Sequence, residues 1–443
     1  MSDRIKTVIK LASVLFLAVA LLLLAQVPRE NFGLTLFLFT LAFGGMLCSY
    51  LLAGDQVSFK RLLLLGLILR GCLFFFEPNW SEDGVRFLWD GELLRQGQNP
   101  YLLTPTQVQE QQGEGSGLSD QFFGALNSPN YFSVYPPLNQ VLFWLGALGA
   151  QGNLEQGYLA LRCILLLGEI GVFCLLWGLL ARFELPKKQI LWYWFNSFVI
   201  LEVVGNLHFE GLVLLFLLAS LGSLTRQKLG LSGIFWGLAV GMKLLPFLLA
   251  PAFFFWKGVR TSLQFWGMAA LVLLLAFLPL VYWYSWQNFL QSLQLYQGKF
   301  EFNASIYYLF RAVGYELAGY NTIWYLTKVG MVCTLLGVLW LTWKRSNASL
   351  FEIPSVWVQL YLLYFLLQPV VHPWYLLTGL GLSILSRQWT FLLWSFGAIF
   401  SYQAYSQNPV QEKTLFLVLE YGLVLVGLYL DYFRKQRTAT LGI

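Results

Sequence analysis

The chain of 443 residues is poor in charge, histidine and cysteine. Charged side chains make up only 11% of it, whereas a soluble domain carries about 25%. There are 2 histidines, and the 5 cysteines lie in apolar segments without paired spacing, at Cys48, Cys72, Cys163, Cys174 and Cys333. This pattern indicates small core residues rather than disulfides or metal ligands.

Several motifs of soluble enzymes are also absent. No GxxxxGK[ST] loop, no GxGxxG after a strand and no HExxH helix occurs, so a cytosolic nucleotide site is not supported. Because there is no DxD motif either, we expect no essential metal and no cofactor. The net charge is +6, but the basic residues do not cluster among aromatic ones, which excludes nucleic acid as an expected partner.

Apolar residues dominate instead. They form 58% of the chain, and several runs reach the ~20 residues that cross a bilayer as a helix. We therefore predict an all-α polytopic membrane protein with about 12–14 transmembrane helices. The sequence places these helices at about 8–26, 33–53, 60–76, 158–181, 189–204, 208–224, 229–242, 244–256, 262–284, 322–343, 353–370, 374–387, 389–405 and 414–433.

The distribution of basic residues predicts the orientation of these helices. Fourteen crossings put both termini on one side, and 18 of the 28 Lys and Arg residues then fall in short segments on that side. The positive-inside rule therefore favours cytoplasmic termini. This layout requires residues 135–150 to form an interfacial or re-entrant helix. We expect one membrane domain over 1–443, with N-terminal helices at 1–60, an outer catalytic loop at 77–157 and a helical bundle at 158–433.

The segments that are not apolar gather on the outer face in this layout. Random polar residues would divide between the two faces, so their convergence predicts one outward-facing site at membrane depth. The five motifs are SEDGVRFLWDG (81–91), NLHFEG (206–211), GMKLLP (241–246), KFEFNASIYYLFR (299–311) and HPWY (372–375).

The first motif places Asp83, Arg86 and Asp90 on one face of a helix, because their spacing is i, i+3, i+7. One interpretation is a surface ion-pair ladder, worth under ~1 kcal/mol. The residues at 74–76 are all Phe, however, so a carboxylate here is partly desolvated, which raises its pKa toward that of a useful base. We predict Asp83 as the catalytic base, with Glu82 as a second catalytic candidate. Arg86 and Asp90 would orient the site.

Lys243 interrupts a long apolar run. Either it snorkels to the outer interface, or it meets an anionic group there, such as the phosphate of a lipid, together with Arg311. Four charged residues lie within predicted spans, where we expect them to pair with other buried polar groups: Arg70, Arg162, Glu169 and Glu202.

Two further motifs carry the histidines. His208 and Glu210 are two residues apart, so on a helix they point apart and are weak evidence for zinc. His372 is a candidate donor to a phosphate or a sugar hydroxyl. Trp374 and Tyr375, which follow it, have the alternative role of interface-belt residues.

Six motifs, taken in their order along the chain, are SEDGVRFLWDGELLRQGQNPY, VYPPL, NLHFEGL, GMKLLPFLLAP, FEFNASIYYLFR and HPWYLL. Together they resemble the GT-C superfamily of integral membrane glycosyltransferases, over about residues 70–390. They look most like bacterial mannosyltransferases that use polyprenyl-phosphate sugars. The resemblance implies a catalytic Asp in the first large outer loop, which Asp83 matches, and a basic contact to the carrier phosphate, which Lys243 could match. Glu210 and His372 match motif positions. Members often have Asp where Glu82 stands here, and they commonly place the loop after one helix rather than three.

The resemblance implies transfer of a single sugar, mannose or another hexose, from a polyprenyl-phosphate donor to a glycan, lipid or protein acceptor, with inversion. Asp83 would be the base, and Lys243 and Arg311 would stabilise the phosphate. The expected location is a bacterial inner or plasma membrane, with the site facing the periplasm or exterior and with membrane lipids as further partners. The remaining candidate substrate-binding residues are Tyr101, Tyr135, Asn303 and Trp374.

Two alternatives remain open. A flippase for lipid-linked sugars should distribute polar groups through its spans toward both faces, often with repeats. Here the polar motifs crowd on one face, and the sequence shows no obvious repeat. An oligosaccharide polymerase or ligase would use a diphosphate-linked donor.

Overall fold

The computed structural model describes residues 3–54, 57–112, 120–253, 262–346 and 349–440. All named elements in these ranges are helical, and the only extended pairing among them is an isolated bridge between Phe302 and Val370. This confirms the predicted all-α class. The chain divides into two compact units. Unit 1 contains Met1–Leu73, Phe173–Glu202 and Glu301–Ile443, and unit 2 contains Phe74–Val172 and Val203–Phe300.

Six helices are long and apolar enough to cross a membrane, among the residues that the structure describes. This confirms an integral membrane protein with several spans. The six are α2 (Phe32–Leu52), α8 (Leu154–Arg182), α14 (Leu263–Tyr282), α17 (Ile323–Lys344), the segment Leu350–Leu367, which contains η4 (Leu350–Glu352) and α18 (Ile353–Leu367), and Thr414–Arg434 of α21 (Thr414–Thr440).

Several of the other predicted crossings are present in shorter pieces. The segment 189–204 was predicted as one helix, but it is broken into η1 (Lys187–Ile190), α9 (Leu191–Trp194), α10 (Ser197–Ile200) and η2 (Leu201–Gly205). The break occurs because the side chain of Asn196 accepts a hydrogen bond from the Phe198 N–H and so begins a new helix. In 244–256, the short η3 (Leu245–Leu249) has Pro246 in its first turn and leads directly into α-helical residues 250–253 within the described part.

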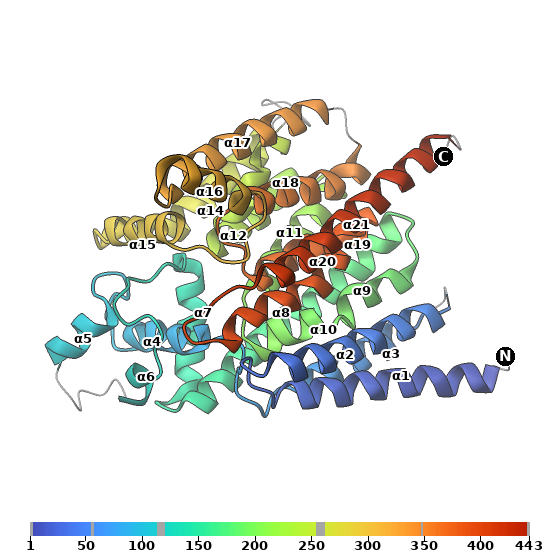
Figure 1. Ribbon diagram of the computed structural model, residues 1–443, viewed down its shortest axis with the longest axis horizontal. Helices are drawn as coiled ribbons and strands as arrows, with labels where there is room; N and C mark the ends of the chain where they lie inside the picture. The colour runs from blue at the N-terminus through green and yellow to red at the C-terminus, as the bar shows by residue number, and fades with distance from the viewer. Residues whose placement is uncertain (1–2, 55–56, 113–119, 254–261, 347–348, 441–443) are drawn as a thin grey trace. The chain divides into compact units, whose positions relative to one another are not determined.

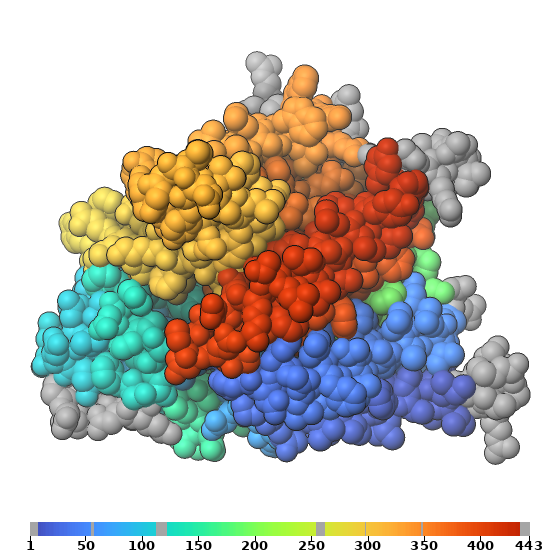
Figure 2. All heavy atoms as spheres, in the orientation of Figure 1, coloured from blue at the N-terminus to red at the C-terminus, as the bar shows by residue number. Residues whose placement is uncertain are grey.

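Unit 1 holds the N-terminal and C-terminal helices. In Figure 1, α1 (Asp3–Leu24) runs along α2, and α20 (Thr390–Gly397) runs along α21. The rings of Phe32 and Phe416, 4.9 Å apart, join α2 to α21. Figure 2 shows α21 as a ridge on one face, bordered by these N-terminal helices. Leu415 and Leu425 on this ridge are 63% and 67% exposed, as expected for side chains that face lipid. The remaining elements of this unit are α3 (Phe59–Gly71), α16 (Ile306–Ala318), η5 (Pro373–Tyr375), α19 (Leu376–Ser386) and η6 (Ala398–Ser406).

Arg70 shows how unit 1 accommodates a buried cation. Its guanidinium donates to the carbonyls of Gly66 (3.2 Å) and Trp194 (2.9 Å) and lies 3.7 Å from the centre of the Trp194 ring. Main-chain oxygens and an aromatic face therefore compensate the buried charge, in agreement with the expected pairing with buried polar groups.

Unit 2 is built around α4 (Asp83–Arg95) and α7 (Pro137–Ala150). The two helices approach closely at Gly91, where a Cβ atom would lie 2.1 Å from the carbonyl oxygen of Phe143. With 14 residues, α7 is about 21 Å long, whereas the hydrocarbon core is about 30 Å thick. The interfacial position predicted for 135–150 stays a prediction. The unit also contains α5 (Pro105–Gln112), α6 (Asp120–Gly124), α11 (Glu210–Leu224), α12 (Leu229–Met242), α14 and α15 (Trp286–Lys299).

Candidate functional site

Asp83 begins α4, where the Oγ of Ser81 accepts a hydrogen bond from its N–H at 3.3 Å. Its side chain is 29% exposed, and its Oδ2 lies 4.0 Å from the Nε2 of His208. The pKa of Asp83 is raised, first by burial and then by the negative charges of Glu210 and Glu82, while His208 and Lys243 oppose the shift. A carboxylate with a raised pKa and an exposed edge has the properties of a general base.

The turn at 206–209 brings His208 to Asp83. Arg162 of α8 donates to the carbonyls of Val204 (3.0 Å), Gly205 (3.1 Å) and Phe74 (3.0 Å). This one guanidinium therefore binds the end of η2 to the segment that leads into α4.

Contacts with the start of α4 then close the turn. The N–H of Trp80 donates to the side-chain oxygen of Asn206 at 3.3 Å. Leu207 adopts the left-handed region with φ of 66°, which a non-glycine residue rarely adopts. A Cβ atom at Gly84 would lie 2.8 Å from Leu207, so the absence of a side chain there allows the turn to pack against α4.

Phe209 lies between His208 and Glu210 and anchors both. Its ring contacts Phe87 of α4 at 5.3 Å and Phe143 of α7 at 5.3 Å, and these two rings stack on each other at 4.5 Å. Because Phe87 lies one helical turn after Asp83, this aromatic packing fixes the turn against the face that carries the carboxylate.

Lys243 lies directly after α12 in an extended conformation. Its ammonium group hydrogen-bonds the carboxylate of Glu210, and its side chain remains 31% exposed. The side-chain amide of Asn139 donates to the carbonyl of Met242, which holds the end of α12 at this position. Lys243 thus has a protein partner beside Asp83. Its contact with a phosphate remains a prediction.

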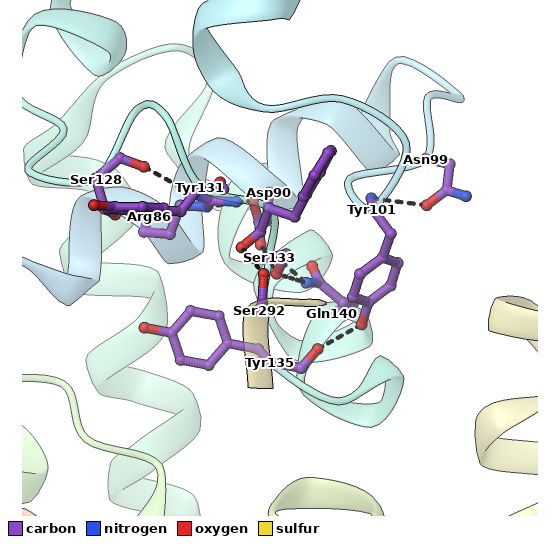
Figure 3. Close-up of polar contacts among 11 residues, drawn as sticks. Arg86, Asp90, Asn99, Tyr101, Ser128, Tyr131, Ser133, Tyr135, Gln140 and Ser292 are labelled. Carbon is purple, nitrogen blue, oxygen red and sulfur yellow. Dashed lines mark hydrogen bonds and ion pairs between the residues drawn. The ribbon is translucent and has the colours of Figure 1, made fainter. Parts of the chain in front are cut away.

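Asp90 and Arg86 form a buried ion pair rather than a surface ladder. Arg86 donates from Nε to Oδ1 of Asp90 at 2.8 Å, and Asp90 is fully buried. The other carboxylate oxygen accepts from Ser133 (2.5 Å) and Gln140 (2.9 Å), as Figure 3 shows. A buried carboxylate satisfied by three donors fixes the segment before α7 to α4.

The same segment is held at two further points. Arg86 donates from Nη1 to the carbonyls of Tyr131 (2.9 Å) and Ser128 (3.3 Å). Tyr101 is only 2% exposed, and its hydroxyl donates to the carbonyl of Tyr135 at 2.5 Å (Figure 3). Tyr101 is therefore buried against the backbone, whereas the ring of Tyr135 lies at the edge of the site.

Tyr296 of α15 belongs to the same electrostatic environment, and the sequence analysis missed it. Its pKa is raised to about 12, first by burial and then by the charge of Asp83, while Arg86 opposes the shift. Burial and then Asp83 also raise the pKa of Tyr135 well above its usual value. Both phenols are thus close enough to Asp83 to be affected by its charge. No motif marks Tyr296, because its relation to Asp83 arises only from folding.

The predicted residues therefore divide between the two units. Three motifs (81–91, 206–211 and 241–246) meet in unit 2, where Glu82 is exposed beside Asp83. Unit 1 contains the candidates of the other two motifs, which are Asn303, Arg311, His372, Trp374 and Tyr375.

Within unit 1, the last two motifs contact each other. The ring of Phe302 stacks on His372 at 5.2 Å, and His372 stacks on Trp374 at 4.5 Å. Tyr375 contacts His372 edge-on at 5.3 Å. These rings form a continuous stack that joins 299–311 to 372–375.

Asn303 and Arg311 are held by carboxylates of the same unit. The N–H of Asn303 donates to Glu412 at 2.6 Å, and its side-chain amide donates to Glu420 at 2.9 Å. Arg311 hydrogen-bonds Glu301 and lies 4.3 Å from the centre of the Tyr308 ring. Asn303 is fully buried, so its main role in this structure is to connect helices.

No group of three or more His, Cys, Asp or Glu side chains in the described part of the chain is arranged to hold a metal ion.

Residues 8–259 match the model of the family described as alpha-(1->6)-mannopyranosyltransferase, N-terminal domain. The matched segment contains Asp83, Arg86, His208, Glu210 and Lys243. Tyr296 and the candidate residues of the last two motifs lie beyond it. No protein of curated function matches the chain.

Proposed function

Since the chain belongs to the alpha-(1->6)-mannopyranosyltransferase family and is a membrane glycosyltransferase that acts on mannose, we propose that its donor is a polyprenyl-phosphate mannose. The observation that carries the catalytic assignment is the half-buried carboxylate of Asp83, with its raised pKa, at the start of α4. Family membership favours this reading over the flippase alternative.

In the proposed reaction, a hydroxyl oxygen of the acceptor attacks the anomeric carbon of the mannose. Its proton passes to the carboxylate of Asp83, and a new C–O bond forms. The bond between the anomeric carbon and the phosphate oxygen breaks, and the phosphate leaves with the electron pair. Because a phosphate monoester is a weakly basic leaving group, the step needs a base more than a strong acid.

Lys243 is the cation that we assign to the leaving phosphate. It is bound to Glu210 and partly exposed, so exchanging that carboxylate for a departing anion needs only a side-chain movement. His208, 4.0 Å from Asp83, would stabilise the carboxylate before the proton is transferred. Lys243 is the stronger candidate of the two, because it lies in the same unit as Asp83 and its charge lowers the pKa of that carboxyl, whereas Arg311 belongs to unit 1.

The stereochemistry gives this proposal a specific consequence. A single displacement inverts the anomeric carbon, and the family description specifies an alpha-(1->6) linkage. An alpha product formed by one inversion requires a donor with a beta linkage to its phosphate. A purified enzyme should therefore use the beta-linked donor and reject the alpha-linked one.

The acceptor would be a glycan, a lipid or a protein at the outer face of a bacterial inner membrane, with both chain termini in the cytoplasm. The excess of basic residues in the short loops assigned to the inner face supports this orientation. Accessibility labelling of single cysteines placed in the 77–157 loop and in the C-terminal tail, in intact cells, tests it.

The test of the catalytic assignment is the Asp83→Asn variant in detergent, supplied with labelled polyprenyl-phosphate mannose and an acceptor. We expect transfer to fall roughly 100-fold or more, because a positioned general base contributes about 10²–10⁴. Asp431→Asn is the matched control, since Asp431 lies in unit 1, where it accepts hydrogen bonds from Trp389 and Thr390.

Undiminished transfer by Asp83→Asn would show that Asp83 is not the base. A donor series separates the remaining classes. Use of a diphosphate-linked donor alone would indicate a polymerase or ligase. Passage of the lipid-linked sugar across vesicles without transfer would indicate a flippase.

A further inference from the structure

We propose that Arg86, Tyr135 and Tyr296 form a subsite for the hydroxyl groups of a hexose beside Asp83, and that Asp90, Ser133 and Gln140 hold it in place. The subsite rests on the proposed function, because it assigns a substrate group to the same site. It adds a residue of α15 that no motif identifies, and it separates sugar binding from the catalytic carboxylate.

Arg86 provides the first observation. A guanidinium carries five N–H donors, and those on Nε and Nη1 bind Asp90, Ser128 and Tyr131. The remaining nitrogen, Nη2, is buried and has no hydrogen-bond partner among the described residues. Leaving a buried donor unsatisfied is costly, so an oxygen atom of a ligand is the natural partner for this nitrogen.

The charge balance indicates which oxygen. The carboxylate of Asp90 already compensates the positive charge of Arg86 at 2.8 Å. The free N–H is therefore better suited to a neutral hydroxyl than to a phosphate, which would bring a second negative charge to a neutral pair. Lys243, which is partly exposed, is the better phosphate ligand of the two cations.

The tyrosines provide the second observation. Both are partly buried. Tyr135 lies two residues after Ser133, which donates to Asp90, and Tyr296 lies one helical turn after Ser292, which donates to the carbonyl of Phe132. The ring of Tyr135 packs edge-on against Phe87 at 5.0 Å, and that of Tyr296 lies 5.2 Å from Phe300. In Figure 3 the Tyr135 ring extends away from Tyr101, so its hydroxyl lies outside the Asp90 network. Fixed phenols of this kind can bind sugar hydroxyls and present an aromatic surface.

The subsite is also tied to α15 as a whole. Ser292 donates to the carbonyl of Phe132 at 2.9 Å, and Asn288 donates to the carbonyl of Tyr101 at 2.9 Å. These bonds attach the helix that carries Tyr296 to the segment that carries Tyr135. The position of both phenols therefore depends on the same backbone segment that Asp90 and Gln140 hold.

The experiment removes one hydroxyl at a time. Tyr135→Phe and Tyr296→Phe keep the rings, and Tyr325→Phe, at an exposed tyrosine of unit 1, is the matched control. In assays with varied donor and varied acceptor, we expect the KM for one sugar substrate to rise roughly 3- to 10-fold. Whichever KM rises identifies the sugar, donor or acceptor, that occupies the subsite.

An unchanged KM for both substrates in both variants overturns the subsite, because a purely structural defect lowers kcat through the active fraction alone. Arg86→Lys, which keeps the charge but loses the guanidinium fork, should raise the same KM.

Binding of methyl α-mannoside to the whole chain, measured by saturation-transfer NMR, distinguishes failure of the subsite from failure of the proposed function. If wild type transfers no mannose but binds the mannoside, and the double Tyr→Phe variant does not, the function fails and the subsite stands. Equal binding by wild type and the double variant overturns the subsite.

Discussion

The close approach of α4 and α7 at Gly91 leads to a quantitative prediction. In Gly91→Ala, the new methyl group would lie 2.1 Å from the carbonyl oxygen of Phe143, whereas ordinary contact begins at 3.4 Å, so the helices must separate by about 1.3 Å. The obstacle is a main-chain atom and cannot rotate away. Overpacking of this kind costs about 1–3 kcal/mol, and occasionally more.

The assay is thermal unfolding of the detergent-solubilised protein, followed by tryptophan fluorescence. A cost of 1 kcal/mol lowers Tm by about 2–4 °C in chains of 150–250 residues, so we expect Gly91→Ala to unfold several degrees below wild type. All variants need the same scan rate, because membrane proteins of this size often unfold irreversibly. Since α4 also carries Asp83, sugar transfer should fall as well.

Gly267→Ala in α14 is the matched control. No atom lies within 4 Å of a Cβ at this position, and replacing a helical glycine by alanine gains roughly 0.5–1 kcal/mol. The two substitutions are chemically identical, but Gly91→Ala should lower the stability of the protein and Gly267→Ala should raise it. If Gly91→Ala were as stable as Gly267→Ala, α4 would not pack tightly on α7. The inference that this packing positions Asp83 would then be wrong.

Two further predictions concern the charged groups of unit 2. Asp90→Ala should lower the free energy of unfolding by about 3–5 kcal/mol, because it leaves the buried guanidinium of Arg86 without its counter-ion. Asp90→Asn should lower it less. Unfolding of Asp90→Ala at the wild-type temperature would contradict this role of the ion pair. The rate of transfer should increase with pH through the pKa of Asp83, since the base acts deprotonated, and this pKa is raised above its ordinary value. Glu210→Gln removes a negative charge that raises the pKa of Asp83, so the midpoint of the pH profile should move to lower pH. Lys243→Gln removes a positive charge that lowers the pKa of Asp83, so the midpoint should move to higher pH. An unchanged midpoint in both variants would mean that another group controls the profile.

Local sequence features were sufficient to predict much of unit 2. The spacing of Asp83, Arg86 and Asp90 predicted one helical face, and all three lie in α4. The segment predicted at 229–242 coincides with α12, since its apolar run ends where a lysine and then a proline follow. Asp83 was also predicted as the candidate base from the aromatic residues before it, although its role awaits the kinetic test.

Contacts between distant segments explain what the sequence could not predict. Asp90 is bound by Ser133 and Gln140, more than 40 residues away in the chain, so its burial was not evident from charge spacing. Gln140 did leave a signal, as a polar residue within the apolar run of α7. Tyr296 left none. The single site expected from five motifs was inferred from chain topology. Three of these motifs lie in unit 2 and two in unit 1, so a site built from all five stays a prediction.

The way in which Arg162 is used has a consequence for substitutions at this site. Within the described part of the chain, the hydrogen bonds of this side chain all go to main-chain carbonyls, those of Phe74, Val204 and Gly205. A carbonyl is present whatever the side chain, so the shape of the turn at 206–209 does not depend on the identity of His208 or Glu210. Substitution of either side chain should therefore change the pKa of Asp83, while Arg162 preserves the framework of the turn.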